Sequence, residues 1–86
     1  MIYQVKLSNK ARKQIKKLDK YTQQRVVAVL ERARIRPQRY AEPLRTRPYH
    51  RLRAGDFRII IDIKDDVLTI LVIEVDRRDK IYKSKK

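Results

Sequence analysis

Residues 49–75, YHRLRAGDFRIIIDIKDDVLTILVIEV, contain three stretches rich in β-branched residues, separated by two short breaks. The stretches YHRLRA, FRIIIDIK and VLTILVIEV alternate between polar and apolar residues or are continuously apolar, as half-buried and buried strands are. The first break contains Gly55, the one glycine of the chain, which suits a turn with positive φ. Because links this short join antiparallel neighbours, the segment predicts three adjacent antiparallel strands.

The residues before this segment predict a strand followed by a helix. Residues 2–7, IYQVKL, alternate as a half-buried strand does. Ser8 or Asn9 can then cap a helix. The apolar residues of that helix fall on one stripe and are Ala11, Ile15 and Leu18.

A second helix is expected from Thr22 to Arg36, because Pro37 disfavours helical geometry in the residue before it. Residues 37–48 hold all three prolines among polar neighbours, which is typical of a surface connection. The expected fold class is α+β with the order β-α-α-β-β-β, an antiparallel sheet with a helical hairpin packed on one face. We expect residues 1–86 to form a single domain, ending in a basic, partly disordered tail over 83–86.

The composition limits the kinds of partner and site. The 86 residues carry 24 Lys and Arg against 10 Asp and Glu, a net charge of +14, so an acidic partner is expected: nucleic acid, an acidic protein or an anionic membrane. The chain has no cysteine and one histidine, which argues against disulfides and against a zinc site. With no signal peptide and no long apolar stretch, the expected location is the cytoplasm.

Arginines recur on one predicted face of the sheet. Alternation in the first strand places Arg51 and Arg53 on one face and Leu52 on the other. In the second strand Arg58 lies on the face opposite Phe57, which can be the face of the other two arginines. Each guanidinium can hold a phosphate through two parallel hydrogen bonds, so the three arginines predict a phosphate site. Arginine stems that only cover apolar surface are the alternative.

Other polar residues have simpler structural explanations. His50 falls on the face of Leu52, where a half-buried, hydrogen-bonded histidine is commoner than a general base. Asp65 and Asp66 stand in a hairpin turn, where aspartate is expected for backbone reasons, and we assign them no chemistry. The first helix is either a solvated face or a track for a nucleic-acid backbone, formed by Lys10, Lys13 and Lys17.

Residues 49–82, YHRLRAGDFRIIIDIKDDVLTILVIEVDRRDKIY, closely resemble the carboxy-terminal half of the RelE/ParE toxin superfamily. Members read approximately Y-R-x-R-x-G-D-[YF]-R-[IV] and, later, V-x-x-R-x-x-x-Y. The resemblance implies a compact α+β toxin of a type II toxin–antitoxin system, encoded with an acidic antitoxin. For the RelE-like branch it implies a ribosome-dependent endoribonuclease, an mRNA interferase that cuts messenger RNA in the decoding site and so inhibits translation.

The resemblance also implies roles for residues of this chain. Arg51 and Arg53 fall where the basic residues of the first sheet strand lie, and Arg58 falls where the arginine at the scissile phosphate lies. Arg78 matches the arginine near the leaving oxygen, and Tyr82 matches the tyrosine that stacks on a base. These five residues are the predicted catalytic set.

The chain departs from some members in its acid and base groups. A glutamate base and a histidine acid have no counterpart that we identify here, and Arg77 stands where the histidine often lies. We therefore expect cleavage without metal or cofactor, by attack of the ribose 2′-hydroxyl, with an arginine-stabilised transition state and no assigned general base. The residues expected to bind nucleic acid outside the catalytic set are Lys10, Lys13, Lys17, Arg77 and Lys80.

The expected partners follow from the same resemblance. They are a cognate acidic antitoxin, messenger RNA and the 16S ribosomal RNA of the decoding region, with no membrane. Two other functions stay open: a ParE-like inhibitor of DNA gyrase that acts through its helical hairpin, and an inactive basic RNA-binding module. Arg58, Arg78 and Tyr82 together favour the nuclease, because ParE-like relatives generally lack the complete basic and aromatic set.

Overall fold

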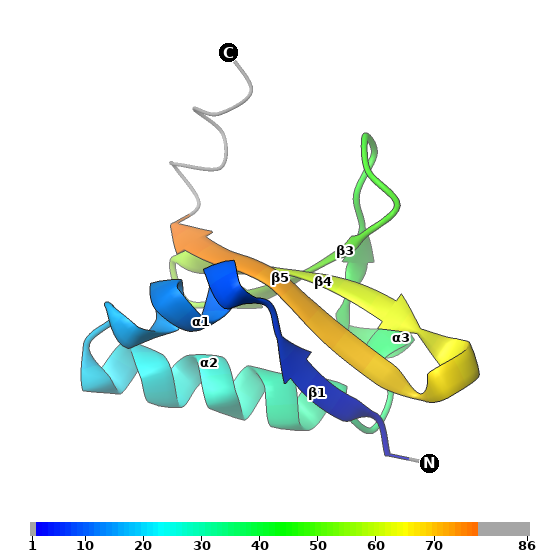
Figure 1. The fold of residues 1–86 in the computed structure, drawn as a ribbon, viewed down its shortest axis with the longest axis horizontal. Coiled ribbons are helices and arrows are strands. Elements are labelled where there is room, and N and C mark those ends of the chain that lie inside the picture. The colour runs from blue at the N-terminus through cyan, green and yellow to red at the C-terminus, as the bar shows by residue number, and fades with distance from the viewer. Residues whose placement is uncertain (1, 78–86) are drawn as a thin grey trace.

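The computed structural model describes residues 2–77, which form an α+β fold built around one five-stranded sheet (Figure 1). The expected fold class is confirmed. The elements in chain order are β1 (Gln4–Leu7), α1 (Asn9–Lys16), α2 (Lys20–Ala33), α3 (Pro37–Tyr40), β2 (Glu42–Pro43), β3 (His50–Ala54), β4 (Phe57–Lys64), the 3-10 turn η1 (Asp65–Val67) and β5 (Thr69–Arg77). The tail expected over 83–86 lies outside the described residues.

The strand order is β1-β5-β4-β3-β2, and β3, β4 and β5 are antiparallel neighbours as expected. The turn between β3 and β4 places Gly55 at φ 63°, the positive value that favours glycine. The prediction of a wholly antiparallel sheet is wrong, because β1 runs parallel to β5, with Val5 opposite Ile70. No tight turn joins these two strands, so the helices and strands between them set their relative direction.

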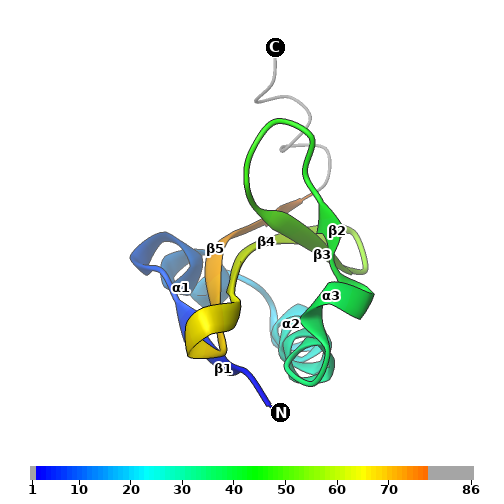
Figure 2. The ribbon, with the colours of Figure 1, turned by 90° about the vertical axis from the view of Figure 1, so that its right-hand side faces the viewer.

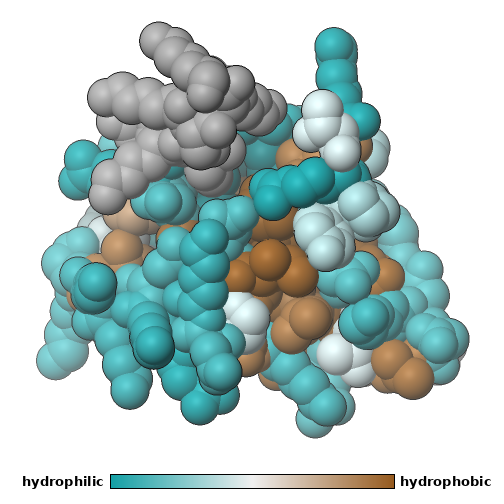
Figure 3. All heavy atoms as spheres, turned by 45° about the horizontal axis from the view of Figure 1, so that its top comes forward, coloured by the Kyte–Doolittle hydropathy of each residue, from teal (hydrophilic) through white to brown (hydrophobic). Residues whose placement is uncertain are grey.

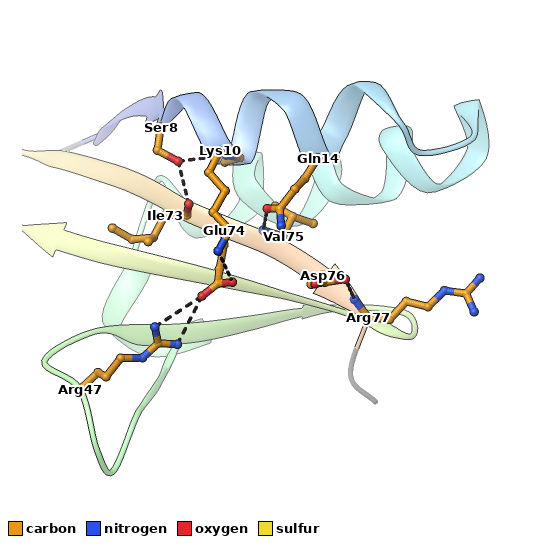
Figure 4. A network of polar contacts seen from close by, with 10 residues as sticks. Ser8, Lys10, Gln14, Arg47, Ile73, Glu74, Val75, Asp76 and Arg77 are labelled. Atoms are coloured by element: carbon orange, nitrogen blue, oxygen red, sulfur yellow. Dashed lines mark hydrogen bonds and ion pairs between the residues drawn. The ribbon is translucent and has the colours of Figure 1, made fainter. Parts of the chain in front are cut away.

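Beyond the end of β1, the cap and the side chains of α1 cover the edge of β5. At a register shift in β5, the hydroxyl of Ser8 donates a hydrogen bond to the carbonyl of Ile73 at 2.7 Å. The backbone N–H of Val75 donates to the side-chain oxygen of Gln14, also at 2.7 Å (Figure 4). Ser8 also caps α1, since its hydroxyl oxygen accepts from the N–H of Ala11. The edge of β5 is thus covered by side chains of α1.

Helix α2 begins at Lys20, before the expected Thr22, because the side chain of Asp19 caps the helix. It ends at Ala33 instead of Arg36. The apolar side of α2 buries Val26 and Leu30 in the core under the sheet.

The expectation that residues 37–48 are only a surface connection is wrong. Pro37 is buried and begins the short helix α3, a position where its missing N–H is not needed. Glu42 and Pro43 form the edge strand β2, which pairs with β3. Proline is tolerated there because an edge strand has a side without hydrogen-bonded neighbours.

The sheet has two different faces (Figure 2). One face packs on the helices and holds the core, with Leu52, Ile59, Ile61, Ile70 and Val72 fully or almost fully buried. The residues of β3, β4 and β5 that alternate with these point to the other side, which we call the open face. The loop of residues 44–49, between β2 and β3, rises on that side, opposite α2. Within residues 2–77, no helix has the length and apolar character needed to cross a membrane.

We expect Ser8→Ala to lower the free energy of unfolding by about 1–2 kcal/mol, because it removes a helix cap and a hydrogen bond to the β5 edge. Urea unfolding followed by circular dichroism measures the loss. Ser8→Thr keeps the hydroxyl and serves as the control. An equal stability of the Ala variant and the wild-type chain would contradict this account of the β5 edge.

Candidate functional site

Three arginines of β3 and β4 lie together on the open face, and we call them the arginine cluster: Arg51, Arg53 and Arg58. Arg53 is directly opposite Arg58 in the antiparallel pairing. Arg51 lies two residues before Arg53 on the same strand, opposite Ile60. The predicted placement of these three residues on one face is therefore confirmed, and their catalytic roles stay a prediction.

The cluster holds positive charge at unequal depth. Arg58 is only 3% exposed, Arg51 is half-buried and Arg53 is exposed. Like charges directly opposite each other in a sheet are destabilising, by a few tenths to about 1 kcal/mol. Asp76 of β5 lies opposite Arg58 on its other side, so one row across the sheet reads Arg53, Arg58, Asp76. The row holds two cations and one carboxylate, and its net positive charge favours an anion on the open face.

Glu42 is a member of the site that the sequence analysis missed. It lies opposite Arg51 in the pairing of β2 with β3, and its carboxylate accepts a hydrogen bond from Arg51 Nη2 at 2.8 Å. This bond, with the charges of Arg51, Arg53 and Arg58, lowers the pKa of Glu42 below its ordinary value. The three guanidinium groups therefore act on one carboxylate. The one available indication was that Glu42 is the only acidic residue between Glu31 and Asp56.

A pocket of about 420 Å³ opens between the cluster and the 44–49 loop. Its lining residues are Glu42, Pro43, Leu44, Arg45, Thr46, Arg47, Arg51, Arg58 and Ile60. Figure 3 looks partly onto the open face and shows hydrophobic side chains gathered in its middle with hydrophilic ones around them. Arg53 lies outside this pocket and lines a smaller hollow of about 160 Å³ at the β3 edge, which Glu42 and Arg51 also line. The pocket combines apolar floor, guanidinium groups and one carboxylate.

The lysines of α1 are placed unevenly relative to this pocket. Lys10 reaches the open face, where its Nζ lies 3.4 Å from the carboxylate of Glu74 on β5 (Figure 4). Lys13 is exposed within α1, and Lys17 is exposed directly after its last residue. Lys10 therefore extends the basic surface from the pocket toward the helix.

Arg77 does not join the cluster. It lies opposite Phe57, on the face of the sheet opposite to that of Arg58. Its guanidinium is 5.8 Å from the centre of the Phe57 ring.

His50 is half-buried, and its Nδ1 is buried without a hydrogen-bond partner among residues 2–77. The predicted site residues Arg78, Lys80 and Tyr82 lie outside the described residues. Residues 2–77 contain no cluster of three or more His, Asp or Glu side chains that could hold a metal ion.

Comparison with known proteins agrees with this fold. The sequence model of the family described as the ParE toxin of the type II toxin–antitoxin system, parDE, matches residues 5–82. The chain belongs to this toxin family. The resemblance to the RelE/ParE superfamily is thereby confirmed, and the protein is a toxin of a type II toxin–antitoxin system. No curated protein is similar enough to give a match.

Solved structures of RelE toxins share the fold of this family member. In the RelBE2 toxin–antitoxin complex of Mycobacterium tuberculosis, the similar chain is 27% identical, with 91% of this chain and all (100%) of that chain covered and a TM-score of 0.83. A mutant of the E. coli toxin RelE in the free state is 23% identical, with coverages of 96% and 93% and a TM-score of 0.81. The archaeal RelE–RelB complex of Pyrococcus horikoshii OT3 gives 20% identity, coverages of 91% and 97%, and a TM-score of 0.74.

We predict that Arg51→Ala raises the pKa of Glu42 toward its ordinary value. The substitution removes both the hydrogen bond and the neighbouring charge that has the largest effect on this pKa. Arg53→Ala should raise it by less. Carboxyl ¹³C NMR titration of the toxin measures both changes. Arg36→Ala, which removes an exposed arginine beside α3, is the control. A Glu42 pKa that ignores Arg51 would show that these side chains do not meet in solution.

Proposed function

We propose that this toxin is an endoribonuclease that cleaves messenger RNA on the ribosome, with the arginine cluster and Glu42 as its catalytic centre. The observation that carries the proposal is the pocket on the open face, which Arg51, Arg58 and a single carboxylate line together. The resemblance to the RelE-like branch and the likeness to RelE structures support the same activity.

RNA carries its own nucleophile, so such an enzyme needs no metal. The protein must deprotonate the ribose 2′-hydroxyl, hold it in line with phosphorus, stabilise the added negative charge and assist the leaving 5′-oxygen. Arg58, fixed by its burial, is suited to stabilise charge on the phosphate, an effect of about 3 kcal/mol for one well-placed donor. Arg51 would hold the phosphate beside Arg58, and Arg53, outside the pocket, would add positive charge at its edge.

Glu42 is the candidate general base. A guanidinium with a pKa above 12 is a poor acceptor of a proton, whereas a carboxylate is a competent one. Among residues 2–77, Glu42 is the one carboxylate that lines the pocket. A hydrogen bond of 2.8 Å from Arg51 orients it. A phosphate that enters the cluster would compete for Arg51 and release the carboxylate toward the 2′-hydroxyl.

The remaining roles rest on the family resemblance. Arg78 would assist the leaving group, and Tyr82 would stack on a base and hold it away from its neighbours. The cations that would follow the RNA backbone and ribosomal RNA are Lys10, Lys13, Lys17, Arg77 and Lys80. Dependence on the ribosome follows if the decoding site presents messenger RNA close to the in-line geometry. The protein would then act in the cytoplasm, where its net charge of +14 favours ribosomal RNA.

The structures similar to this toxin include complexes of a RelE toxin with its RelB antitoxin. We propose an acidic cognate antitoxin for this toxin as well. A negatively charged, amphipathic segment that folds on contact could neutralise the arginine cluster and close the pocket. Such a complex would form at a rate that falls with added salt.

Arg58→Ala should lower the rate of messenger RNA cleavage on programmed ribosomes by about a hundredfold to a thousandfold, as the loss of one charge-stabilising donor does. Primer extension across the cleaved codon measures the rate. Arg58→Lys keeps a cation and should retain part of the activity, and Arg36→Ala should retain all of it. Circular dichroism identifies a variant that fails to fold. Full activity of a folded Arg58→Ala variant would disprove this catalytic centre.

The proposed base gives a prediction for pH dependence. Glu42 must be ionised to accept a proton, and its lowered pKa keeps it ionised into the acidic range, so kcat/KM should fall only as the pH drops through that lowered value. Arg51→Ala should move this acidic limb to higher pH. Glu42→Gln should abolish the limb and lower the rate about a hundredfold. A limb that persists in Glu42→Gln would assign the base to another group.

A ParE-like activity against DNA gyrase is the second candidate, because the matching family model is that of ParE. Gyrase supercoiling in the presence of the toxin separates the two functions. Inhibition that survives Arg58→Ala but is lost on substitution of exposed α2 residues such as Val27 would favour gyrase. RNA binding without cleavage and without gyrase inhibition would leave the inactive RNA-binding module.

A further inference from the structure

Glu74 joins three parts of the molecule that are distant in sequence. It lies on β5, opposite Ile60, and its side chain is only 16% exposed on the open face. One carboxylate oxygen lies 3.4 Å from both terminal nitrogens of Arg47, in the 44–49 loop. The other oxygen lies 3.4 Å from Nζ of Lys10, on α1. Figure 4 shows both cations pointing to this one carboxylate.

The loop that Arg47 holds is one wall of the proposed RNA pocket. Residues 44–47 line the pocket on the side facing Arg51 and Arg58. The base of the loop is closed by a hydrogen bond of 3.0 Å from the N–H of Leu44 to the carbonyl of Tyr49. The Arg47 guanidinium also lies over the Tyr49 ring, 5.9 Å from its centre. A loop without helix or strand keeps one position only where such contacts hold it.

We propose that Glu74 is a positioning residue of the RNA site: it holds Arg47, and with it the 44–49 loop, so that the pocket is preformed for a single RNA strand. Glu74 acts through Arg47 and does not itself contact the RNA. The inference rests on the proposed function, whose phosphate-binding pocket the loop completes.

Simple electrostatics leads to the opposite expectation, which makes the proposal testable. A carboxylate beside a site for a polyanion repels it, so its neutralisation alone should strengthen RNA binding. If Glu74 instead positions Arg47, neutralising Glu74 frees the loop. RNA binding must then order the loop, which weakens the affinity. The sign of the change in affinity after Glu74→Gln therefore distinguishes positioning from repulsion.

The experiment measures binding of a fluorescent single-stranded RNA whose 2′-hydroxyl groups are methylated, so that it cannot be cleaved. Glu74→Gln should weaken binding about threefold to tenfold, since it removes a charge-assisted contact that preorganises the loop. Amide hydrogen exchange should become faster in residues 44–49 and stay unchanged in β4. Unchanged or stronger RNA binding in this variant would overturn the proposal.

Glu31→Gln is the matched control. It makes the same change of charge at an exposed ion pair with Arg34, 2.7 Å long, on α2 beneath the other face of the sheet. It should leave loop exchange unchanged and should not weaken RNA binding.

A double-mutant cycle tests whether Glu74 acts through Arg47. Arg47→Ala should weaken binding by at least as much as Glu74→Gln, and adding Glu74→Gln to Arg47→Ala should produce no further loss. Fully additive losses would overturn the proposal, because Glu74 would then act independently of Arg47.

Cleavage assays separate this inference from the proposed function. With messenger RNA on programmed ribosomes, Glu74→Gln should mainly raise KM, whereas Arg58→Ala should mainly lower kcat. If the wild-type toxin binds RNA but cleaves no messenger RNA on programmed ribosomes, the proposed nuclease is wrong and the binding data still decide the role of Glu74. If the toxin binds no RNA, both are wrong.

Discussion

The register of β3 against β4 is the constraint on which the site depends. Leu52 opposite Ile59 buries an apolar pair against the helices, and the same register places Arg53 opposite Arg58 on the open face. A slip by one residue would turn the arginines toward the core and the apolar pair toward solvent. The burial of the core therefore also holds the guanidinium groups together, at a site where their mutual repulsion alone would separate them.

Carboxylates placed between the cations make this concentration of charge compatible with folding. Glu42 lies beside Arg51, Asp76 lies opposite Arg58 in the sheet, and Glu74 contacts Lys10 and Arg47. Each acidic group comes from an element other than that of the cation it meets. The open face thus places opposite charges next to one another around an apolar floor. A surface that binds nucleic acid only through positive charge does not require such carboxylates.

The fold alone does not separate the activities found among related toxins, because one fold supports different sites. The functional argument therefore depends on the chemistry of the pocket. Guanidinium groups at different depths, a carboxylate beside them and a loop above them are the features on which the proposed RNA cleavage rests.

The sequence by itself determined the elements whose information is local. Alternation predicted the faces of β3 and β4, Gly55 marked the turn between them, and Ser8 was one of two predicted caps for α1. The resemblance of residues 49–82 to a known family of toxins was sufficient to indicate the family. The faces, the turn and the cap depend on residues within a few positions of one another, and the resemblance depends on one continuous segment.

Only the tertiary structure decided which distant segments meet. The parallel pairing of β1 with β5, the pairing of Glu42 with Arg51, and the contact of Glu74 with Lys10 and Arg47 join segments between 9 and 65 residues apart. Periodicity assigns a side chain to a face, but it contains no information about the neighbouring strand or loop. That choice follows from packing the whole chain around one core, and it placed the carboxylates within reach of the arginines and Lys10.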